Sequence, residues 1–523
     1  MSTKDLVFTR PASGLVKAMS WWDIALIGIS APAGSGILYY SVSTASTYPG
    51  ANVALSFLVG LLLFFPIAFL GATTSTMIPR SGSLYVLVSR VLGPTIGHLA
   101  AFLFYIGYSL AVGVVAYVFV GVLSGIVALG GSLGGSPLLR TLAGIMLQPG
   151  LRLVISIGLL TLVWISTLQG VHVFRDTMRS LFVITLGSGL VTIIYFMAVS
   201  GSTLRARFDG SWGTGAFEGI ITLARSKGWG FPGFSWHETI NALLVVLWAY
   251  GGIELVNYAS GEVRQAGRNL FRGLLTAWAV LGLLYSGLAF SVTRAFGQFL
   301  GAYDFLFKNH RDLLATVMTP VDPSIPFYVS STIGNPWLGL ILALGTALWL
   351  VNTMIPYFFA PSRLIFALAM DKAVPPWLAR VSERRGAPTW ATHLTFGFAI
   401  LGVLLNLLQV EVVLGTILFC VFFIFWLYGL AAVLLPSKRP DIYAMSPVQR
   451  SILGVPVISL VGLAAFGVGW FLLFFTIRQM TVGISIGASI VIVLCLLVYL
   501  YQYRKNIKVG VPVESIYAEI PPA

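Results

Sequence analysis

Long apolar runs separated by short polar stretches dominate the chain from residue 21 to residue 503. Each run is long enough to cross the roughly 30 Å hydrocarbon layer of a bilayer as an α-helix. The alternating segments of about ten residues that are typical of a membrane β-barrel are absent. The pattern therefore predicts an all-α polytopic membrane protein with twelve spans. The spans are expected at residues 21–47, 51–78, 94–129, 152–172, 178–200, 237–260, 273–297, 335–370, 391–409, 411–435, 454–477 and 482–503.

The first span contains residues that weaken an α-helix in its middle. Within the stretch Gly28–Ile37, Pro32 lacks a backbone N–H and disfavours helix at the residue before it. Gly34 and Gly36, which follow, are poor helix formers. We therefore expect the helix to break here and to restart near Gly34. The alternative is a kinked but continuous span, because glycine and proline are frequent in membrane helices.

The sixth span carries a similar interruption at the pair Gly251–Gly252. Both spans also open with an aromatic residue followed closely by an acidic one, at residues 21–23 and 236–238. Five spans separate the equivalent positions, so the second copy must cross the membrane in the opposite direction. Paired broken helices in two inverted halves mark the binding site of a transporter near the middle of the membrane. This pairing favours a true break over a kink in the first span.

Composition and charge support the membrane interpretation. The 523 residues are 57% hydrophobic and 9% charged, whereas a soluble chain carries about a quarter charged residues. The net charge of +14 would suit a nucleic-acid partner, but the basic residues lie mainly in short loops between spans. Of these, 20 fall at the termini and in every second loop, 10 fall on the opposite side, and Arg363 lies inside span eight. The positive-inside rule therefore places both termini in the cytoplasm, and no nucleic-acid partner is expected.

This pattern divides the chain without a soluble domain. Two long outer loops, 201–236 and 298–334, carry aromatic residues, glycine and proline, so we expect ordered or partly re-entrant lids. Cys420 and Cys495 lie in apolar runs without metal-binding spacing, and no cofactor or metal is predicted. The expected units are a cytoplasmic N-terminus (1–20), a first five-helix repeat (21–200), an extracellular loop (201–236), a second, inverted five-helix repeat (237–435), two extra transmembrane helices (436–503) and a cytoplasmic C-terminus (504–523).

Four motifs resemble those of permeases of the amino acid–polyamine–organocation (APC) superfamily. The segment 77–94 resembles the loop after span two of that family, and Ser362–Lys372, leading to the Gly-Ala-Pro at 386–388, resembles the end of its span eight. Residues 34–37 (GSGI) match a motif of its first span, and residues 252–254 match the glycine and glutamate of its sixth span. The resemblance covers about residues 13 to 435, with the motifs in the family's order.

The resemblance implies the LeuT-type five-plus-five inverted repeat, with discontinuous helices 1 and 6, two extra C-terminal helices and alternating access. It also implies amino acid transport rather than an enzyme activity. The residues agree with a zwitterionic substrate, because amides at a half-helix N-terminus suit a carboxylate and free carbonyls at the breaks suit an ammonium group. The expected substrate-binding residues are Ala31, Gly34, Ser35, Gly36, Trp248, Ala249, Tyr250 and Gly251.

Three further residues, Phe104, Tyr357 and Glu254, are candidates for gating or coupling, and Trp248 could also close over the substrate. Trp248 adjoins the second break, where similar permeases close an aromatic over the substrate, and motif register assigns Phe104 and Tyr357 to gate positions. Phe104 and Tyr357 could equally be packing residues. Glu254 is the acid nearest mid-membrane, where an ionisable residue is a functional hypothesis by default. It could be protonated during transport or cap backbone donors at the second break.

The coupling ion is left open, with a proton favoured over sodium. Sodium-coupled relatives of this fold place a hydroxyl pair in span eight facing the first break, and the expected positions here are Ala360–Pro361 with Ser362 beyond. Span five carries only Arg179 at its rim, rather than the lysine of some sodium-independent members. At the cytoplasmic rim, we expect ion pairs that hold the inner gate shut. Their candidate residues are Arg80, Arg90, Glu262, Arg363 and Asp371.

The function predicted from the sequence is a secondary active transporter of amino acids in the cytoplasmic membrane. Gly107, Ala111 and Val112 in span three suggest an apolar side-chain pocket, which favours neutral or hydrophobic substrates. The alternatives are an organic amine or cation transporter of the same fold, or a non-transporting membrane sensor. The expected partners are a small-molecule substrate and the lipid bilayer, and no oligomeric state is predicted.

Overall fold

The computed structural model describes residues 14–408, 410–511 and 516–517. Within these residues, 12 helical spans are long and apolar enough to cross a membrane, as the hydropathy pattern predicts. The spans are α1 (Trp21–Ser35) with η1 (Gly36–Tyr40) and α2 (Ser41–Thr47), α3 (Val53–Met77), α5 (Pro94–Leu133), α7 (Pro149–Leu168), α8 (Val171–Ala198), α11 (Trp236–Asn241) with α12 (Leu243–Tyr250) and η2 (Ile253–Tyr258), α13 (Ala266–Phe296), α17 (Pro336–Met370), α18 (Thr389–Leu408), α19 (Val410–Lys438), α21 (Val457–Arg478) and α22 (Val482–Lys508).

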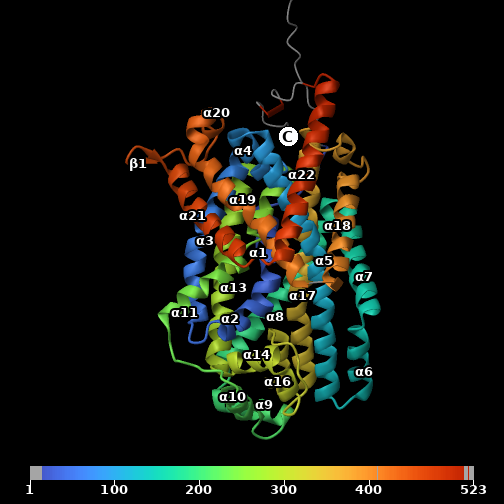
Figure 1. The fold of residues 1–523 in the computed structure, drawn as a ribbon, viewed down its shortest axis with the longest axis vertical. Helices are drawn as coiled ribbons and strands as arrows, with labels where there is room; N and C mark the ends of the chain where they lie inside the picture. The colour runs from blue at the N-terminus through green and yellow to red at the C-terminus, as the bar shows by residue number, and fades with distance from the viewer. Residues whose placement is uncertain (1–13, 409, 512–515, 518–523) are drawn as a thin grey trace, which may run out of the picture.

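The helices run roughly parallel, so the bundle has two distinct ends (Figure 1). The even number of described spans brings Gly14 and Tyr517, the outermost described residues, to one of them, which we call the terminal face. It carries α4 (Ser83–Leu92), η3 (Ser260–Glu262), η4 (Pro376–Ala379), α20 (Pro440–Tyr443) and the strands β1 (Ser451–Ile452) and β2 (Val455–Pro456). The opposite end, which we call the loop face, carries α6 (Pro137–Met146), α9 (Gly201–Trp212), α10 (Ala216–Ser226), α14 (Phe299–Asn309), α15 (Arg311–Leu314) and α16 (Ile325–Thr332).

The two long loops on the loop face are ordered, as their aromatic content predicts. Each folds into short helices that pack against one another through aromatic rings. The ring of Phe217 in α10 stacks on Phe299 in α14 at 4.3 Å between centroids, and Phe208 in α9 meets the same ring at 4.9 Å. Every residue of α16 is buried. These loops therefore form a packed cap over the loop face.

The spans differ strongly in how much of their surface the protein covers. In the first span, 83% of the most apolar window is buried, against 22% in α7 and 28% in α22. The first span packs against α13 and α17, while α21 packs against α19 at the edge of the bundle. A helix with few buried residues must face lipid in a membrane, so the first span lies at the centre of the fold and α7 and α22 lie at its edge.

The sixth span is broken where the sequence predicts it. The helix α12 ends at Tyr250, the backbone is extended at Gly251, and η2 resumes at Ile253 as a 3-10 helix. Gly252 between them has a φ of +116°, which favours glycine over any residue with a side chain. A Cβ at Gly252 would also lie 3.2 Å from the Pro32 nitrogen. The glycine is therefore required by both the turn and the close approach of the first span.

The first span is not broken, so the predicted discontinuity of helix 1 is wrong. The chain stays helical from Trp21 to Thr47 and widens into a π-helical turn over Gly36–Tyr40. A hydroxyl from α17 bridges the two backbone groups that a regular turn would pair: Thr353 Oγ1 accepts from the Gly34 N–H at 3.0 Å and donates to the Ser30 carbonyl at 2.7 Å. Because this side chain satisfies both groups, the span stays helical at the glycines that follow Pro32.

Candidate substrate-binding site

The first and sixth spans meet at the break of the sixth. Gly252 lies against Ala31 and Pro32 of the first span. The hydroxyl of Tyr285, on α13, lies 2.8 Å from the Pro32 carbonyl and 2.8 Å from the Ala249 carbonyl. One buried phenol thus joins carbonyl groups of both spans at the point where carbonyls were expected to receive an ammonium group. Sequence reasoning missed Tyr285, because its contact with two distant spans exists only in the folded chain.

The predicted carboxylate-binding amides are engaged within the protein in this conformation. The Gly34 N–H donates to Thr353, and the Gly36 N–H donates to the carbonyl of Ala33. A Cβ at Gly36 would lie 2.3 Å from the Tyr285 ring, and one at Gly34 would lie 2.6 Å from Thr353 Oγ1. Both glycines are therefore needed for the close approach of these two side chains. A carboxylate would have to displace the Thr353 hydroxyl to reach the Gly34 N–H.

The positions of span eight that were expected to face the first break, Ala360 and Pro361, carry no hydroxyl, and the hydroxyl of this span that contacts the first span is that of Thr353. Ser362 Oγ instead donates to the Phe359 carbonyl of its own helix and accepts from Arg363 at 2.9 Å. Next to Thr353, the amide nitrogen of Asn352 donates to Ser30 Oγ at 2.8 Å. Its oxygen Oδ1 is buried without a hydrogen-bond partner among the described residues. The face of α17 that meets α1 is set by packing between the two helices, so these contacts of Asn352 and Thr353 become visible only in the folded chain.

Glu254 caps the broken end of the sixth span, which was one of its two expected roles. Its side chain is 2% exposed. The carboxylate accepts from the Gly252 N–H at 2.9 Å and from the Tyr108 hydroxyl at 2.5 Å. The Glu254 carbonyl in turn accepts from Asn257 Nδ2 at 2.7 Å. A carboxylate two residues after the break therefore satisfies a donor that the break exposes.

Aromatic rings surround the Tyr108–Glu254 contact. The Tyr108 ring lies 4.6 Å from that of Phe104 and 4.8 Å from that of Tyr357. Phe104 is fully buried and also contacts Tyr258 at 5.0 Å, so it occupies a packing position. Tyr357 is half-buried on α17. The structure thus brings together both predicted gate aromatics and Glu254 around Tyr108, a residue that sequence reasoning missed.

The aromatic residues before the break point in different directions. Trp248 is half-buried, and its ring faces Phe422 of α19 at 6.1 Å. A Cβ at Gly251 would lie 3.7 Å from the same Phe422 ring. Tyr250 instead donates to the Phe57 carbonyl of α3 at 2.8 Å, and its side chain is fully buried. Trp248 therefore remains a candidate to cover a substrate, whereas the Tyr250 side chain secures the sixth span to the second.

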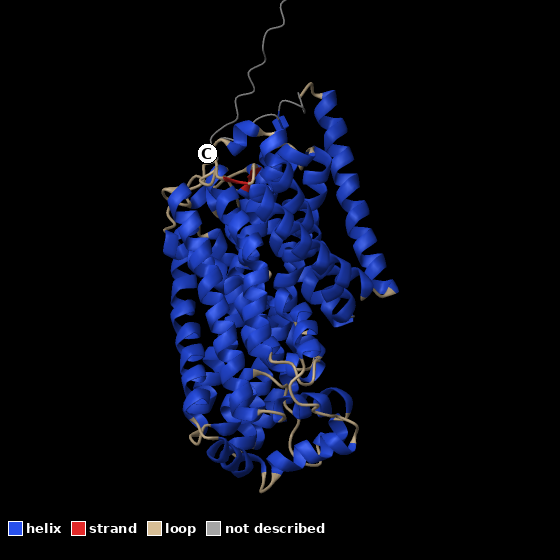
Figure 2. Ribbon diagram, turned by 90° about the vertical axis from the view of Figure 1, so that its left-hand side faces the viewer, coloured by secondary structure: helices blue, strands red, loops and turns tan. Residues whose placement is uncertain are grey.

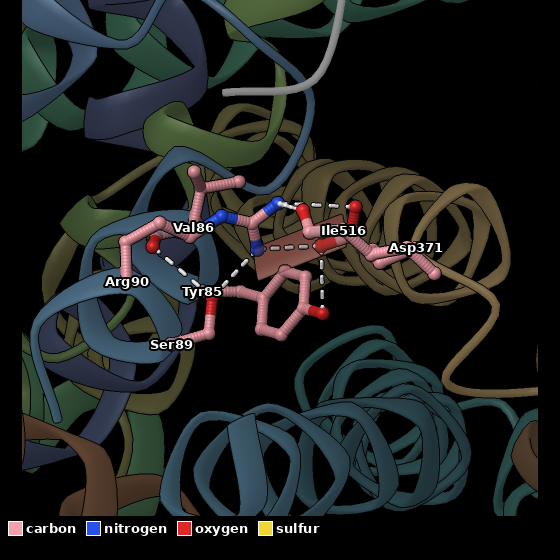
Figure 3. Close-up of polar contacts among 6 residues, drawn as sticks. All are labelled: Tyr85, Val86, Ser89, Arg90, Asp371 and Ile516. Carbon is pink, nitrogen blue, oxygen red and sulfur yellow. Dashed lines mark hydrogen bonds and ion pairs between the residues drawn. The ribbon is translucent and has the colours of Figure 1, made fainter. Parts of the chain in front are cut away.

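Ion pairs at the terminal face join four of the residues predicted for this rim. Arg90 of α4 contacts Asp371 through two hydrogen bonds of 2.6 Å and 3.1 Å (Figure 3). The Tyr85 hydroxyl donates to the same carboxylate at 2.9 Å. Burial raises the pKa of Tyr85 well above its usual range, and the Asp371 carboxylate adds to the shift, so Tyr85 stays a donor. A second buried pair joins Arg363 to Glu262 at 2.8 Å.

Both ends of the described chain pack against this rim. At the N-terminal side, Asp23 forms a capping box with Ser20 and an ion pair with Arg179 at 2.7 Å. At the C-terminal side, the Ile516 carbonyl accepts from Arg90 Nη2 at 3.4 Å (Figure 3), and the Tyr517 ring lies 5.1 Å from the Arg90 guanidinium carbon. The two chain ends therefore contact elements that any opening on this face would have to move.

The loop face is bridged to the first span in a similar way. Tyr39, in the π-helical turn, donates to Asp322 of the loop before α16 at 3.1 Å. Ser46 donates to Asp304 of α14, which also pairs with Lys308 at 2.7 Å. Burial raises the pKa of Asp322, while its hydrogen bond with Tyr39 acts in the opposite direction. Polar contacts thus tie the first span to neighbouring elements at both ends of the bundle.

Comparison with known proteins gives the family. The profile of a family described as amino acid permease matches residues 19–498. The chain belongs to the amino acid permease family. Among curated relatives, it is 25% identical to the branched-chain amino acid permease BcaP of Bacillus subtilis, over 97% of this chain and 98% of the relative. It is also 25% identical to the methylthioribose transporter of the same organism, over 83% of this chain and 84% of the relative. Cationic amino acid transporter 1 of Arabidopsis thaliana is 21% identical over 73% of this chain and 57% of the relative.

Membership of this family agrees with the prediction that the protein is a transporter and not an enzyme. The structure also gives a physical reason for the motif after the second span of this permease. Gly82 has a φ of +77°, and a Cβ there would lie 2.8 Å from that of Ala367. Ser83 donates to the Asn257 carbonyl just beyond the sixth-span break. The motif therefore packs α4 against α17 and the sixth span at the terminal face.

Proposed function

We propose that this permease is a secondary active transporter that moves amino acids across the cytoplasmic membrane by alternating access. The observation that supports it most directly is that two hydroxyl groups hold backbone groups of opposite polarity beside the break of the sixth span. The Thr353 hydroxyl accepts a hydrogen bond from the Gly34 N–H, while the Tyr285 hydroxyl contacts the Pro32 and Ala249 carbonyls. An N–H donor suits a carboxylate and carbonyl acceptors suit an ammonium group. A zwitterion could replace both hydroxyls.

In this proposal, the amides of Gly34, Ser35 and Gly36 bind the carboxylate after the Thr353 hydroxyl withdraws. The ammonium group binds carbonyls of the two spans, including that of Ala249. In the structure, the Thr353 hydroxyl pairs with the Gly34 N–H and the Tyr285 hydroxyl lies within hydrogen-bond distance of the Pro32 and Ala249 carbonyls, so these backbone groups already have partners. Substrate binding then exchanges one set of hydrogen bonds for another, which favours a transition between states of similar free energy.

We propose neutral or hydrophobic side chains for the substrate. Trp248 and Phe422 lie at the broken end of the sixth span and offer an apolar surface. Gly107 does not widen a pocket as expected from the sequence, because a Cβ there would lie 3.1 Å from that of Cys420, so this glycine serves close helix packing. Glu254 accepts hydrogen bonds from the Gly252 N–H and the Tyr108 hydroxyl, so this single acid is already engaged as the cap of the sixth span. These features argue against polyamines, which need several carboxylates.

Proton coupling is favoured over sodium coupling, with Glu254 as the proposed proton-binding residue. Protonation of one carboxylate oxygen would remove an acceptor for the Gly252 N–H or for the Tyr108 hydroxyl. Either loss would loosen the cap at the break of the sixth span. The orientation proposed from the basic residues makes the terminal face cytoplasmic and the loop face extracellular. The repeat boundaries at 21–200 and 237–435 are part of the same proposal.

A ligand screen followed by flux measurements tests the proposal. Purified permease is heated with each amino acid and with amines that lack a carboxylate, and ligands that raise the unfolding temperature are then tested for uptake into proteoliposomes. We expect a neutral amino acid to stabilise the protein and to accumulate when a proton gradient is imposed, with no dependence on a sodium gradient. Stabilisation by amines alone would favour the cation-transporter alternative. Absence of both stabilisation and flux for every amino acid would contradict the proposal.

A further inference from the structure

The strands β1 and β2 form a small hairpin that projects sideways from the terminal face in Figure 1 and appears in red near the same end in Figure 2. Ser451 pairs with Pro456, and Ile452 pairs with Val455. The two residues of the turn, Leu453 and Gly454, have φ values of +51° and +79°. The hairpin is therefore a two-residue turn of the primed kind, with both central residues in the left-handed region.

The residue at the tip is unusual for such a turn. Left-handed turn positions are normally occupied by glycine, asparagine or aspartate, because a Cβ makes the conformation unfavourable and polar side chains suit water. Here the position holds Leu453, which is 99% exposed. Its neighbours Ile452 and Val455 are 56% and 42% exposed. Three apolar side chains thus extend from a strained turn, an arrangement that water would disfavour.

The position of the hairpin along the chain places it at a membrane boundary. Its second strand leads directly into α21, a span of 22 residues. At 1.5 Å per residue, such a helix is about 33 Å long, close to the roughly 30 Å hydrocarbon layer. Its first residue, Val457, therefore lies near the edge of that layer. Leu453 precedes Val457 by four residues, so it lies within about 13 Å of that edge.

One basic residue lies at the base of the hairpin, and a second lies on the same face of the bundle. Arg450 precedes the first strand, is exposed, and its carbonyl accepts from the Val457 N–H at 2.9 Å, which closes the base of the hairpin. Lys438 is exposed at the end of α19 on the same face. Apolar side chains with cationic residues beside them have the composition of segments that lie in the lipid interface, where the cations meet phosphate groups.

We propose that the hairpin of residues 451–456 is a lipid-binding finger that inserts Leu453, with Ile452 and Val455, into the leaflet at the terminal face. Arg450 and Lys438 lie at the level of the lipid phosphates. The insertion itself does not depend on the transport proposal, and the proposed orientation only identifies the leaflet as the cytoplasmic one. Because α21 packs against α19, the finger links the lipid surface to the helix that carries Phe422 beside Trp248.

Site-specific fluorescence of the full-length protein in lipid nanodiscs tests this proposal. A Leu453→Cys variant is labelled with an environment-sensitive fluorophore, and Glu383→Cys, in an exposed loop of the same face, serves as the matched control. The natural residues Cys420 and Cys495 are buried and should not react. We expect blue-shifted emission at residue 453, strong quenching by nitroxide lipids and little quenching by iodide. The control should show the opposite, since the same label there lies in water.

The other occupants of this surface are distinct outcomes of the same experiment. Efficient quenching of the 453 label by iodide, to the level of the 383 control, would contradict insertion. Disulfide cross-linking between two molecules of the unlabelled Leu453→Cys variant, in place of lipid quenching, would assign the finger to an interface between copies and also overturn the proposal. An Arg450→Gln variant of the labelled protein should lose the increase in lipid quenching that anionic phospholipid produces over phosphatidylcholine. None of these readouts requires transport, so the finger and the transport proposal can fail separately.

Discussion

The hydroxyl of Thr353 is inserted between the Ser30 carbonyl and the Gly34 N–H, which would bond to each other in a regular α-helix. This contact helps the first span to remain helical where Gly34 follows Pro32. It also places a removable hydrogen-bond partner on the amide that is proposed to bind the substrate carboxylate. The Thr353–Gly34 pair is therefore the point at which fold stability and proposed substrate binding meet.

Replacing Thr353 with valine tests this double role. Valine has nearly the same shape but cannot bridge the helix, so two buried backbone groups lose their partner. We expect a destabilisation of about 1–3 kcal/mol, measured as a lower unfolding temperature in detergent. Thr346→Val is the matched control, because the Thr346 hydroxyl is also buried in α17 but donates only to the Leu342 carbonyl of its own helix. Equal losses for the two variants would contradict the bridging role.

Tyr285→Phe should change substrate binding more than folding. The hydroxyl contacts two carbonyls that are proposed to receive the ammonium group, so it competes with the substrate for them. Its removal, worth about 1 kcal/mol, should strengthen binding of the amino acid about fivefold. The dissociation constant can be measured by equilibrium binding with purified protein. Tyr303→Phe, which removes a hydroxyl bonded to Val321 on the loop face, is the control. Weaker binding by the Tyr285 variant would indicate that the hydroxyl supports the site instead.

Some features of this fold depend on local sequence, and others depend on packing between distant spans. Spans are visible because hydropathy is a local property, and the break of the sixth span was predictable because two adjacent glycines produce it. The cap by Glu254 was also accessible, since it lies two residues from the donor it satisfies. The continuity of the first span was not, because Thr353 is distant in sequence and reaches Gly34 only through packing. The contact of the Tyr250 hydroxyl with the Phe57 carbonyl was not predictable for the same reason, because Phe57 lies in another span.

The contact between Tyr39 and Asp322 predicts a pH-dependent stability. Burial raises the pKa of Asp322 in the folded protein above the value of about 3.9 expected when unfolded. The folded state therefore binds the proton more tightly, so stability should be greatest at low pH and fall as the pH rises through the folded pKa. Asp322→Asn should remove this part of the dependence. Unfolding temperatures of both proteins, measured as the pH is raised from the unfolded value of about 3.9 towards neutrality, provide the test. Parallel curves for the two proteins would contradict it.

The buried pair of Arg90 and Asp371 should be costly to break from one side. An Arg90→Met variant leaves the Asp371 carboxylate in an enclosed site, with a loss of about 3–5 kcal/mol expected. The double variant Arg90→Met, Asp371→Leu should recover much of that loss, because neither charge is then buried alone. Arg205→Met, in an exposed pair with Glu218, should have little effect on the unfolding temperature. A double variant that is less stable than the single one would contradict this account.

Glu254→Gln separates capping from proton coupling. Glutamine keeps one acceptor oxygen for the break of the sixth span but cannot take up a proton in the relevant range. We expect the variant to fold and to exchange labelled for unlabelled amino acid across proteoliposome membranes, but to lose accumulation driven by a proton gradient. Exchange and gradient-driven uptake can be measured in the same preparation. Undiminished accumulation would exclude Glu254 as the coupling residue while leaving its observed cap unchanged.

The central claim is that backbone groups of the first and sixth spans recognise both ends of a zwitterion. The most direct measurement compares the affinity of the purified permease for the amino acid that stabilises it most with the affinities for its methyl ester and its N-acetyl derivative. The account predicts that loss of either the carboxylate or the ammonium group weakens binding at least about tenfold, since each removes a charge-assisted hydrogen bond. Equal affinity for the ester or for the acetylated form would contradict it.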